Sequence, residues 1–393
     1  MNERLDEFSA EYQAMLDMEA KQIQSRLGIS EENEKSATLE HSDKPEAVAL
    51  GQRRSFPNIR SSVKQYVEWY IRQGKGNTEQ VSTELEAKTA EIKDKLVMSY
   101  YSNFGNAKRV IESGSLKNLF EFAGTEQDER KKAAEISLDV ALMKRRDVDQ
   151  ALGWQRPETV YHLAVELDEE GHHPQGPGSN YGAIRFVFDF EKLAEHSTFT
   201  EGDSLNPAQI PNALSDKKRG SLSPSRGVEN RQISAEHVPI AKAVFNLATE
   251  HEQLPPNAAI FLRYIEAQVG EISGAEVVSN LKGIQVDIEE AFQEARLHRL
   301  LYDADKEKYL YRHYMGRNPG DPVPPTDFSK PLEKDNFDEY YKELAGLRWA
   351  NFVALLDNVK HFCESKGIEY KQTGDMDKVK DAIYYLTKKI AFY

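Results

Sequence analysis

The amino-acid sequence predicts an α+β fold, with a small strand-rich part between helical N-terminal and C-terminal regions. Three observations support this class. Helical spacing of apolar residues dominates both ends of the chain, alternating segments gather between residues 160 and 270, and no regular alternation of strand and helix occurs. The length of 393 residues and the shifts in composition divide the chain into a region 1–57, a domain 58–300 and a region 301–393.

The first region is predicted to be one amphipathic helix followed by a linker. Apolar side chains recur at helical spacing over residues 3–27, and Gly28 fits a C-cap. Residues 29–57 are polar, contain two prolines and lack periodicity, which favours a linker. We expect the apolar stripe of the helix either to dock on the rest of the chain or to bind a partner such as a chaperone.

The elements up to residue 151 are mostly helical. The second helix, 58–73, ends at a glycine-rich turn that lacks the preceding strand and the spacing of a phosphate loop. Thr78 is expected to cap a third helix, 78–93. The pattern then predicts a strand at 96–101, a helix at 106–112 closed by Gly114, and a long helix at 127–151.

The strand-rich part follows. Strands are expected at 160–167, 181–190, 197–200 and 260–269, with a helical turn at 191–196, a long polar loop at 205–233 and a helix at 234–251. Residues 274–287 are expected to add a further short strand. The remaining segments, 288–315, 336–365 and 375–391, have helical patterns.

The strand 260–269 carries the most informative polar residues. Because successive side chains of a strand point to opposite faces, Tyr264, Glu266 and Gln268 share one face, while the other face is mainly apolar. A carboxylate and an amide beside a tyrosine suit a cleft in which the carboxylate steadies a positive charge. The alternative is a solvated strand face whose polar residues only pair across strands.

Composition excludes several classes of function. A net charge of −14 disfavours nucleic acid as the main partner and disfavours an anionic membrane surface. No run of about 18 apolar residues occurs, and the charged N-terminus has no apolar signal region. Cys363 is the only cysteine, so no internal disulfide forms. We expect a protein folded in the cytoplasm, for which export into a host or target cell would need a specialised system.

Common catalytic motifs are missing from the sequence. His172 and His173 lie in a Gly/Pro-rich loop without the further ligands that zinc needs, so we predict no metal site. No serine lies in a G-x-S-x-G turn and no G-x-G-x-x-G follows a strand. Kinase, hydrolase and dinucleotide-fold functions therefore lack support.

An ordered set of short segments carries a family resemblance. The order is the Phe120-Glu121-Phe122-Ala123-Gly124-Thr125 turn, Tyr181-Gly182, Ser197-Thr198-Phe199 followed by Asp203-Ser204, and Tyr264-Ile265-Glu266-Ala267-Gln268-Val269. Together, over residues 95–285, these segments resemble a little-characterised bacterial family with an ADP-ribosyltransferase-like fold. The resemblance implies an enzyme that cleaves the nicotinamide–ribose bond of NAD and transfers ADP-ribose to a protein acceptor, as toxins and effectors do.

The resemblance also implies the catalytic residues. Glu266 matches the glutamate of the family's final strand, which holds the ribose 2′-hydroxyl and stabilises the oxocarbenium-like charge. Gln268 would orient the acceptor. The pair departs from the family pattern, because it is Glu-x-Gln rather than Glu-x-Glu or Gln-x-Glu.

The NAD-binding residues follow from the same resemblance. Thr198 would support Glu266, Arg109 or Lys108 would bind the phosphates, and Tyr181 or Phe122 would stack on nicotinamide. The first core strand departs from the family, since it offers Tyr100 and Tyr101 in place of an Arg or His. The alternative function is a catalytically inactive binding module that acts through the flanking helices.

Overall fold

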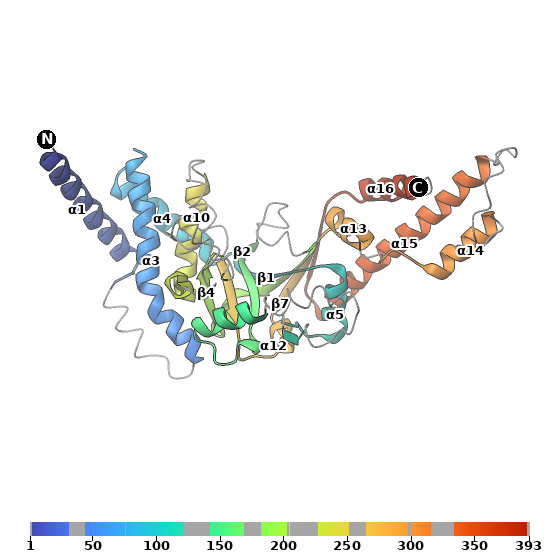
Figure 1. Cartoon of the computed structure of the whole chain (residues 1–393), viewed down its shortest axis with the longest axis horizontal. Coiled ribbons are helices and arrows are strands. Elements are labelled where there is room, and N and C mark those ends of the chain that lie inside the picture. Colours follow the sequence, from blue (N-terminus) through green and yellow to red (C-terminus); the bar gives the residue numbers. More distant parts are fainter. Residues whose placement is uncertain are drawn as a thin grey trace. The chain divides into compact units, whose positions relative to one another are not determined.

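The computed structural model describes residues 2–30, 44–74, 76–118, 120–121, 142–168, 182–202, 204, 227–250, 265–297, 300–315 and 334–390. Helices and strands both occur throughout, which confirms the α+β class (Figure 1). The chain folds into two compact units. Unit 1 comprises Met1–Tyr100, Ser115–Gly171 and Phe188–Asn280, and unit 2 comprises Tyr101–Gly114, His172–Val187 and Leu281–Tyr393. Each unit therefore collects segments from several parts of the sequence.

Unit 1 contains an antiparallel sheet. Its strands lie in the order β5-β4-β6-β2-β1, where these are Gln232–Ile233, Ser197–Glu201, Ile265–Val269, Tyr161–Leu167 and Leu96–Ser102. The predicted strands at 96–101, 160–167 and 197–200 are confirmed. β6 lies at the centre of these five strands and pairs with both β4 and β2. All five residues of β6 are buried, so neither of its faces is solvated.

A layer of helices packs together in unit 1. Its members, which lie side by side in Figure 1, are α1 (Asn2–Arg26), α3 (Glu46–Arg72), α4 (Thr78–Lys93) and α10 (Val238–Glu250). Leu16 and Ile23 of α1 are fully buried, and Gln24 donates a hydrogen bond to the Arg60 carbonyl of α3 at 3.0 Å. The apolar stripe of α1 is therefore used within the protein. The smaller helices of unit 1 are α8 (Phe190–Ala194) and α12 (Gly274–Ser279).

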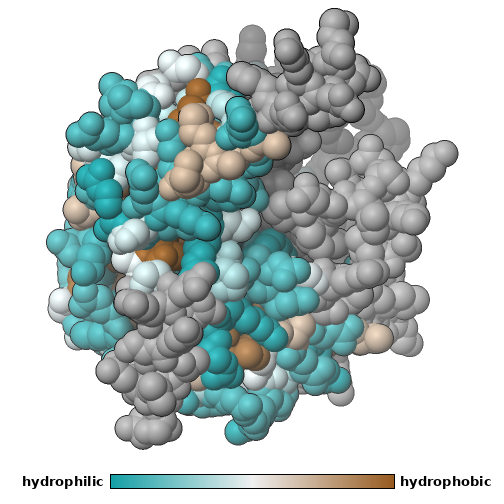
Figure 2. Space-filling model, turned by 90° about the vertical axis from the view of Figure 1, so that its left-hand side faces the viewer, coloured by the Kyte–Doolittle hydropathy of each residue, from teal (hydrophilic) through white to brown (hydrophobic). Residues whose placement is uncertain are grey.

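The surface of this helical layer is mainly polar. On the face that carries α1 and α3, the described residues are mostly hydrophilic, and hydrophobic ones form small separate areas (Figure 2). Met18 of α1, for example, is 61% exposed, whereas Leu16 of the same helix is inaccessible.

Two expectations for the N-terminal part are wrong. Residues 46–57 of the predicted linker are helical, because Ala47, Gly51, Ser55 and Phe56 bury one face of α3 at helical spacing. The residue that caps α4 is Asn77 rather than Thr78. Its side chain accepts from the Gln80 backbone N–H at 3.0 Å, and the Gln80 side chain accepts from the Asn77 N–H at 2.9 Å.

Unit 2 combines strands with longer helices. Strand order is β3-β7-β8, where these are Ile184–Asp189, Leu281–Asp287 and Glu369–Thr373, and β7 and β8 are parallel. The helices are α5 (Phe104–Ser113), α13 (Ile288–Leu297), α14 (Ala304–Met315), α15 (Lys334–Lys366) and α16 (Met376–Ile390). Phe352 of α15 is fully buried, with its ring centroid 6.0 Å from Phe292 and 6.4 Å from Phe104. These aromatic contacts tie three of the helices together.

The predictions for the later helices and strands are confirmed in part. Gly114 ends α5 with a positive φ of 64°, as expected of a C-cap glycine. The segment 288–315 forms two helices rather than one, and 274–279 is helical before the strand β7. The end of the predicted loop 205–233 contains β5, and residues 205–226 lie outside the described part. The sequence pattern also missed β8.

Candidate functional site

Glu266 is the second residue of β6, and its side chain is directed into the interior of unit 1. It is 2% exposed, and its register partners are Ala164 on β2 and Thr200 on β4. Gln268 pairs in the same way with His162 and Thr198. Because directly opposed residues share a face of an antiparallel sheet, this sheet face carries a group of polar side chains in the interior.

Three residues form what we call the carboxylate cluster: Glu266, Arg145 and Ser204. Arg145 Nη1 lies 2.9 Å from Glu266 Oε1 and donates to Ser204 Oγ at 2.7 Å. Ser204 donates to Glu266 Oε2 twice, from its backbone N–H at 2.8 Å and from its hydroxyl at 2.9 Å. Both carboxylate oxygens are therefore occupied, one by a cation and the other by two neutral donors.

These contacts keep Glu266 ionised. Burial by itself raises the pKa of this carboxyl group, but the charges of Arg145 and His162 and the two hydrogen bonds from Ser204 outweigh it. The net result is a pKa below the ordinary value for glutamate. Arg145 is itself only 7% exposed, so the pair is shielded from solvent.

Two partly buried carboxyl groups differ from Glu266 in the direction of their pKa shift. Burial raises the pKa of Glu201 to about 7, although the Ser62 hydroxyl lies 2.8 Å from both of its oxygens. Burial also raises the pKa of Glu294 in unit 2 to about 7, helped by the charge of Glu290. Glu266 has a lowered pKa because it has what the other two lack, a directly bonded guanidinium.

A His–Asp pair lies beside the cluster. His162 Nε2 is 3.1 Å from Asp149 Oδ1, and Asp149 is fully buried. The second oxygen of Asp149, Oδ2, is also buried and has no hydrogen-bond partner among the residues that the structure describes. Since the His162 side chain is still 17% exposed, a carboxylate orients an imidazole that remains reachable from outside.

Gln268 belongs to a hydrogen-bonded chain across two strands. The Thr198 hydroxyl donates to Gln268 Oε1 at 2.9 Å, and Gln268 Nε2 donates to the Thr200 hydroxyl at 3.0 Å. Trp154 Nε1 donates to Thr198 Oγ1 at 3.2 Å. Gln268 thus joins β4 to β6. The sequence predicts that Thr198 supports Glu266, but its hydroxyl bonds Gln268 instead. The groups that bond Glu266 are Ser204 and Arg145.

The other residues predicted for the site either belong to unit 2 or lie outside the described residues. Arg109 is an exposed residue of α5 in unit 2, and Lys108 beside it lies 3.6 Å from Glu112. Tyr181, Phe122, His172 and His173 lie outside the described residues. Of the six predicted site residues, the structure therefore brings together Glu266, Gln268 and Thr198.

A small cavity of about 130 Å³ borders Thr198. Gly51 of α3 also lines it, and a Cβ at that glycine would lie 2.9 Å from Gln232 Nε2. Pockets for drug-sized ligands measure about 300–1,000 Å³, so this space is too small for a dinucleotide. Glu266 does not line it.

Sequence reasoning missed Arg145, His162 and Asp149. Arg145 lies in the basic run Lys144-Arg145-Arg146, which looks like a solvated helix surface. His162 is a single histidine in a mainly apolar strand that also contains Glu166. A signal does exist for Ser204, because it follows the Thr-Phe strand in the segment set. The other three become recognisable only when the strands are paired.

Several classes of site are absent from the part of the chain that the structure describes. Nowhere in these residues do three His, Cys, Asp or Glu side chains come together as metal ligands. Among the described helices, none has the length and apolar character needed to span a membrane. No protein-family model, curated protein or solved structure matches this chain.

Proposed function

We propose that this protein is a mono-ADP-ribosyltransferase that uses NAD as its substrate and modifies a protein acceptor. The observation that carries the proposal is Glu266, an interior carboxylate held in its charged form on the central strand of unit 1. Cleavage of the nicotinamide–ribose bond leaves a positive charge on the ribose, and the bonding electrons depart with nicotinamide. A fixed carboxylate stabilises that charge.

The contacts of Glu266 suggest how the site operates. Ser204 fixes Oε2 by two hydrogen bonds, while Arg145 bonds Oε1. In the proposed reaction Arg145 withdraws as NAD binds, which frees Oε1 for the ribose, and Ser204 keeps the carboxylate in position. In this scheme Arg145 bonds Oε1 when NAD is not bound, and the ribose replaces it there in the complex.

The His162–Asp149 pair suits the second half of the reaction. The acceptor nucleophile must lose a proton when it bonds to the ribose carbon. An imidazole oriented by a buried carboxylate is a suitable general base for that proton. In this scheme Gln268 holds the strands together and Glu266 is the catalytic residue.

Labelled NAD tests the proposal. The protein is incubated with NAD and a cell lysate, and both labelled protein and released nicotinamide are measured. We expect Glu266→Gln to lower both signals by about 100-fold or more, because charge stabilisation in the transition state is lost. Glu201→Gln is the matched control, since it alters a partly buried carboxyl group of unit 1 that does not contact Glu266 and should keep the wild-type rate.

Two results would contradict the proposal. If the wild-type protein labels nothing and releases no nicotinamide, the enzymatic function is wrong. If Glu266→Gln is as active as the wild type, another residue stabilises the ribose cation. The toxin or effector role and export by a specialised system belong to the same proposal and follow its outcome.

A catalytically inactive binding module is the second candidate. The observation in its favour is that Glu266 is 2% exposed and both of its oxygens already have partners. A ligand that binds the native state raises the melting temperature as its concentration increases. A melting temperature that does not change with NAD would favour the module, and a saturable rise would favour the enzyme.

A further inference from the structure

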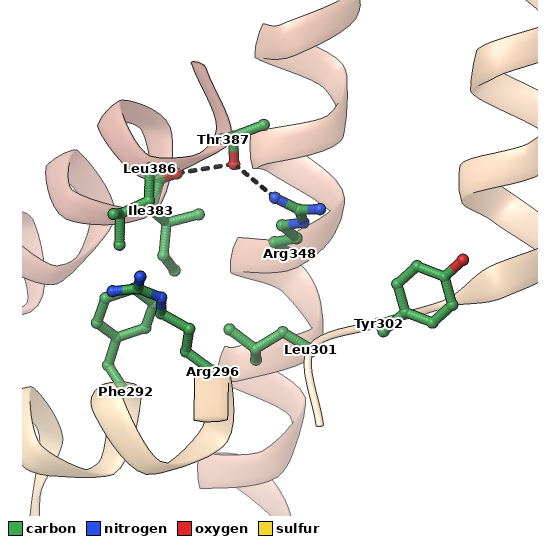
Figure 3. A pocket seen from close by; sticks show the side chains of 8 residues that line it. All are labelled: Phe292, Arg296, Leu301, Tyr302, Arg348, Ile383, Leu386 and Thr387. Atoms are coloured by element: carbon green, nitrogen blue, oxygen red, sulfur yellow. Dashed lines mark hydrogen bonds between the residues drawn. The ribbon is translucent and has the colours of Figure 1, made fainter. Parts of the chain in front are cut away.

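Unit 2 contains a cavity that is larger than the one in unit 1. Its volume is about 520 Å³, which lies within the range of small-molecule sites. Figure 3 shows that the lining side chains come from α13, from the segment after it, and from α15 and α16. They are Phe292, Arg296, Leu301, Tyr302, Arg348, Ile383, Leu386 and Thr387.

The walls of the cavity are apolar and fixed. Phe292, Leu301 and Ile383 are 3%, 7% and 2% exposed, so their other sides are packed in the core of unit 2. Leu386 of α16 lies next to Ile383 in the same wall (Figure 3). This part of the cavity suits the apolar body of a ligand.

Arg348 supplies a positioned cation. Its Nη1 donates to the Thr387 hydroxyl at 3.2 Å, and the hydroxyl itself donates to the Ile383 carbonyl at 2.8 Å (Figure 3). Its Nη2 lies 3.6 Å from Glu307, so one acidic group offsets its charge. The guanidinium is therefore held in place without being saturated.

Arg296 supplies a second cation, which differs from Arg348 in its exposure and its partners. It lies in the last turn of α13, four residues after Phe292, and it is exposed. Within the described ranges, neither an ion pair nor a side-chain hydrogen bond involves its guanidinium. Among the described residues, the two arginines and Glu307 give the cavity one positive charge in excess.

We propose that this cavity binds a small amphipathic anion, with an acidic head at Arg296 and Arg348 and an apolar body against Phe292, Ile383 and Leu386. The apolar walls alone would accept a neutral ligand, but the excess positive charge selects a negative head. A carboxylate and a phosphate monoester share this chemistry, because a guanidinium bonds either one bidentately. The inference is independent of the ADP-ribosyltransferase proposal, since all lining residues belong to unit 2.

Calorimetric titration of the full-length protein with decanoate tests the site. Decanol and decyltrimethylammonium are the neutral and cationic counterparts, and decyl phosphate distinguishes the two acidic heads. We expect saturable binding of decanoate or decyl phosphate, and binding of both counterparts that is at least tenfold weaker. The stronger of the two acidic ligands identifies the head group.

Variants locate the binding. Arg296→Met should weaken the affinity for the better anion about tenfold or more, because a charge-assisted bond is lost. Leu386→Trp should weaken binding, because the indole takes up part of the space that the apolar body needs. Arg312→Met removes a cation from the surface of α14 outside the cavity and should bind as the wild type does.

Three results would overturn the inference. They are no binding of either anion to the wild type, equal binding of decanol, or unchanged affinity in both Arg296→Met and Leu386→Trp. Because Arg296 is exposed, its substitution should leave the fold intact, and circular dichroism of each variant checks this. Inorganic phosphate alone should bind more weakly than decyl phosphate, because it lacks the apolar body.

Discussion

The carboxylate cluster of unit 1 and the cavity of unit 2 use arginine in opposite ways. In the cluster, Arg145 and Glu266 are both buried and bonded to each other and to Ser204. At the cavity, Arg296 is exposed beside apolar walls and open space. A shielded charge with full partners is committed to compensating those partners in the folded state, whereas a charge next to an unfilled apolar space is available for binding.

Removing Arg145 should have the largest effect of the changes we consider. Arg145→Met leaves the Glu266 carboxylate buried without its cation, which costs about 3–5 kcal/mol of unfolding free energy. Denaturant unfolding, followed by tryptophan fluorescence in a Trp349→Phe background, measures this unfolding free energy. In that background the two remaining tryptophans, Trp69 and Trp154, both report on unit 1.

The double variant Arg145→Met/Glu266→Met is the control for this prediction. It removes both charges, and apolar replacement of a whole buried pair is often nearly neutral, so most of the lost stability should return. Equal stability of the single and double variants would show that the pair is not the source of the cost.

Gln268→Leu should have the next largest effect. The substitution leaves the Thr198 hydroxyl without its acceptor and the Thr200 hydroxyl without its donor, at an expected cost of about 2–3 kcal/mol. The same fluorescence measurement applies. Gln65→Leu on the exposed surface of α3 is the matched control and should stay within about 0.5 kcal/mol of the wild type.

The elements of the site were largely predictable, but its partners were not. Alternation of side chains placed Glu266 and Gln268 on one strand face, and β6 confirms that face from Ile265 to Val269. Arg145 lies 121 residues from Glu266 in the sequence, so no local pattern connects them. Local patterns describe strands and helices, while a buried ion pair depends on which elements pack together.

The two missed elements have physical explanations of their own. Strand β8 has the sequence Glu369-Tyr370-Lys371-Gln372-Thr373, which is mostly exposed at the edge of its sheet and shows no apolar alternation. The first half of α3 contains Arg53, Arg54 and Pro57, which are not typical of a buried helix. Its buried stripe consists mainly of small residues, so the sequence shows no clear apolar periodicity there. Burial of Gly51 and Ser55 is a consequence of packing, and composition does not reveal it.

The pH dependence of stability should separate Glu201 from Glu266. The folded pKa of Glu201 is raised to about 7, above the ordinary value of 4.5, so between these values the folded state holds a proton that the unfolded state has released. Stability from this group is therefore present at low pH and is lost as pH rises from about 4.5 to 7.

Comparison with Glu201→Gln isolates the pH-dependent contribution of Glu201 to the unfolding free energy. Between pH 5 and 7.5 the wild type should lose about 1–2 kcal/mol relative to the variant, which keeps a neutral acceptor for Ser62. Glu266 has the opposite sign, because its folded pKa is lowered and its contribution is lost only as pH falls below 4.5. A constant difference between wild type and Glu201→Gln across this pH range would show that Glu201 titrates normally.

Arg296→Met should have the smallest effect on stability and is the direct counterpart of Arg145→Met. An exposed guanidinium without an ion pair among the described residues loses little when it is removed, so the unfolding free energy should change by less than about 0.5 kcal/mol. Trp349 fluorescence in a Trp69→Phe/Trp154→Phe background reports on unit 2, and Arg312→Met controls for the loss of one positive charge. A cost of several kcal/mol would place Arg296 among structural residues and remove the difference between the two sites, because the same side chain would then be committed to the fold rather than available for a ligand.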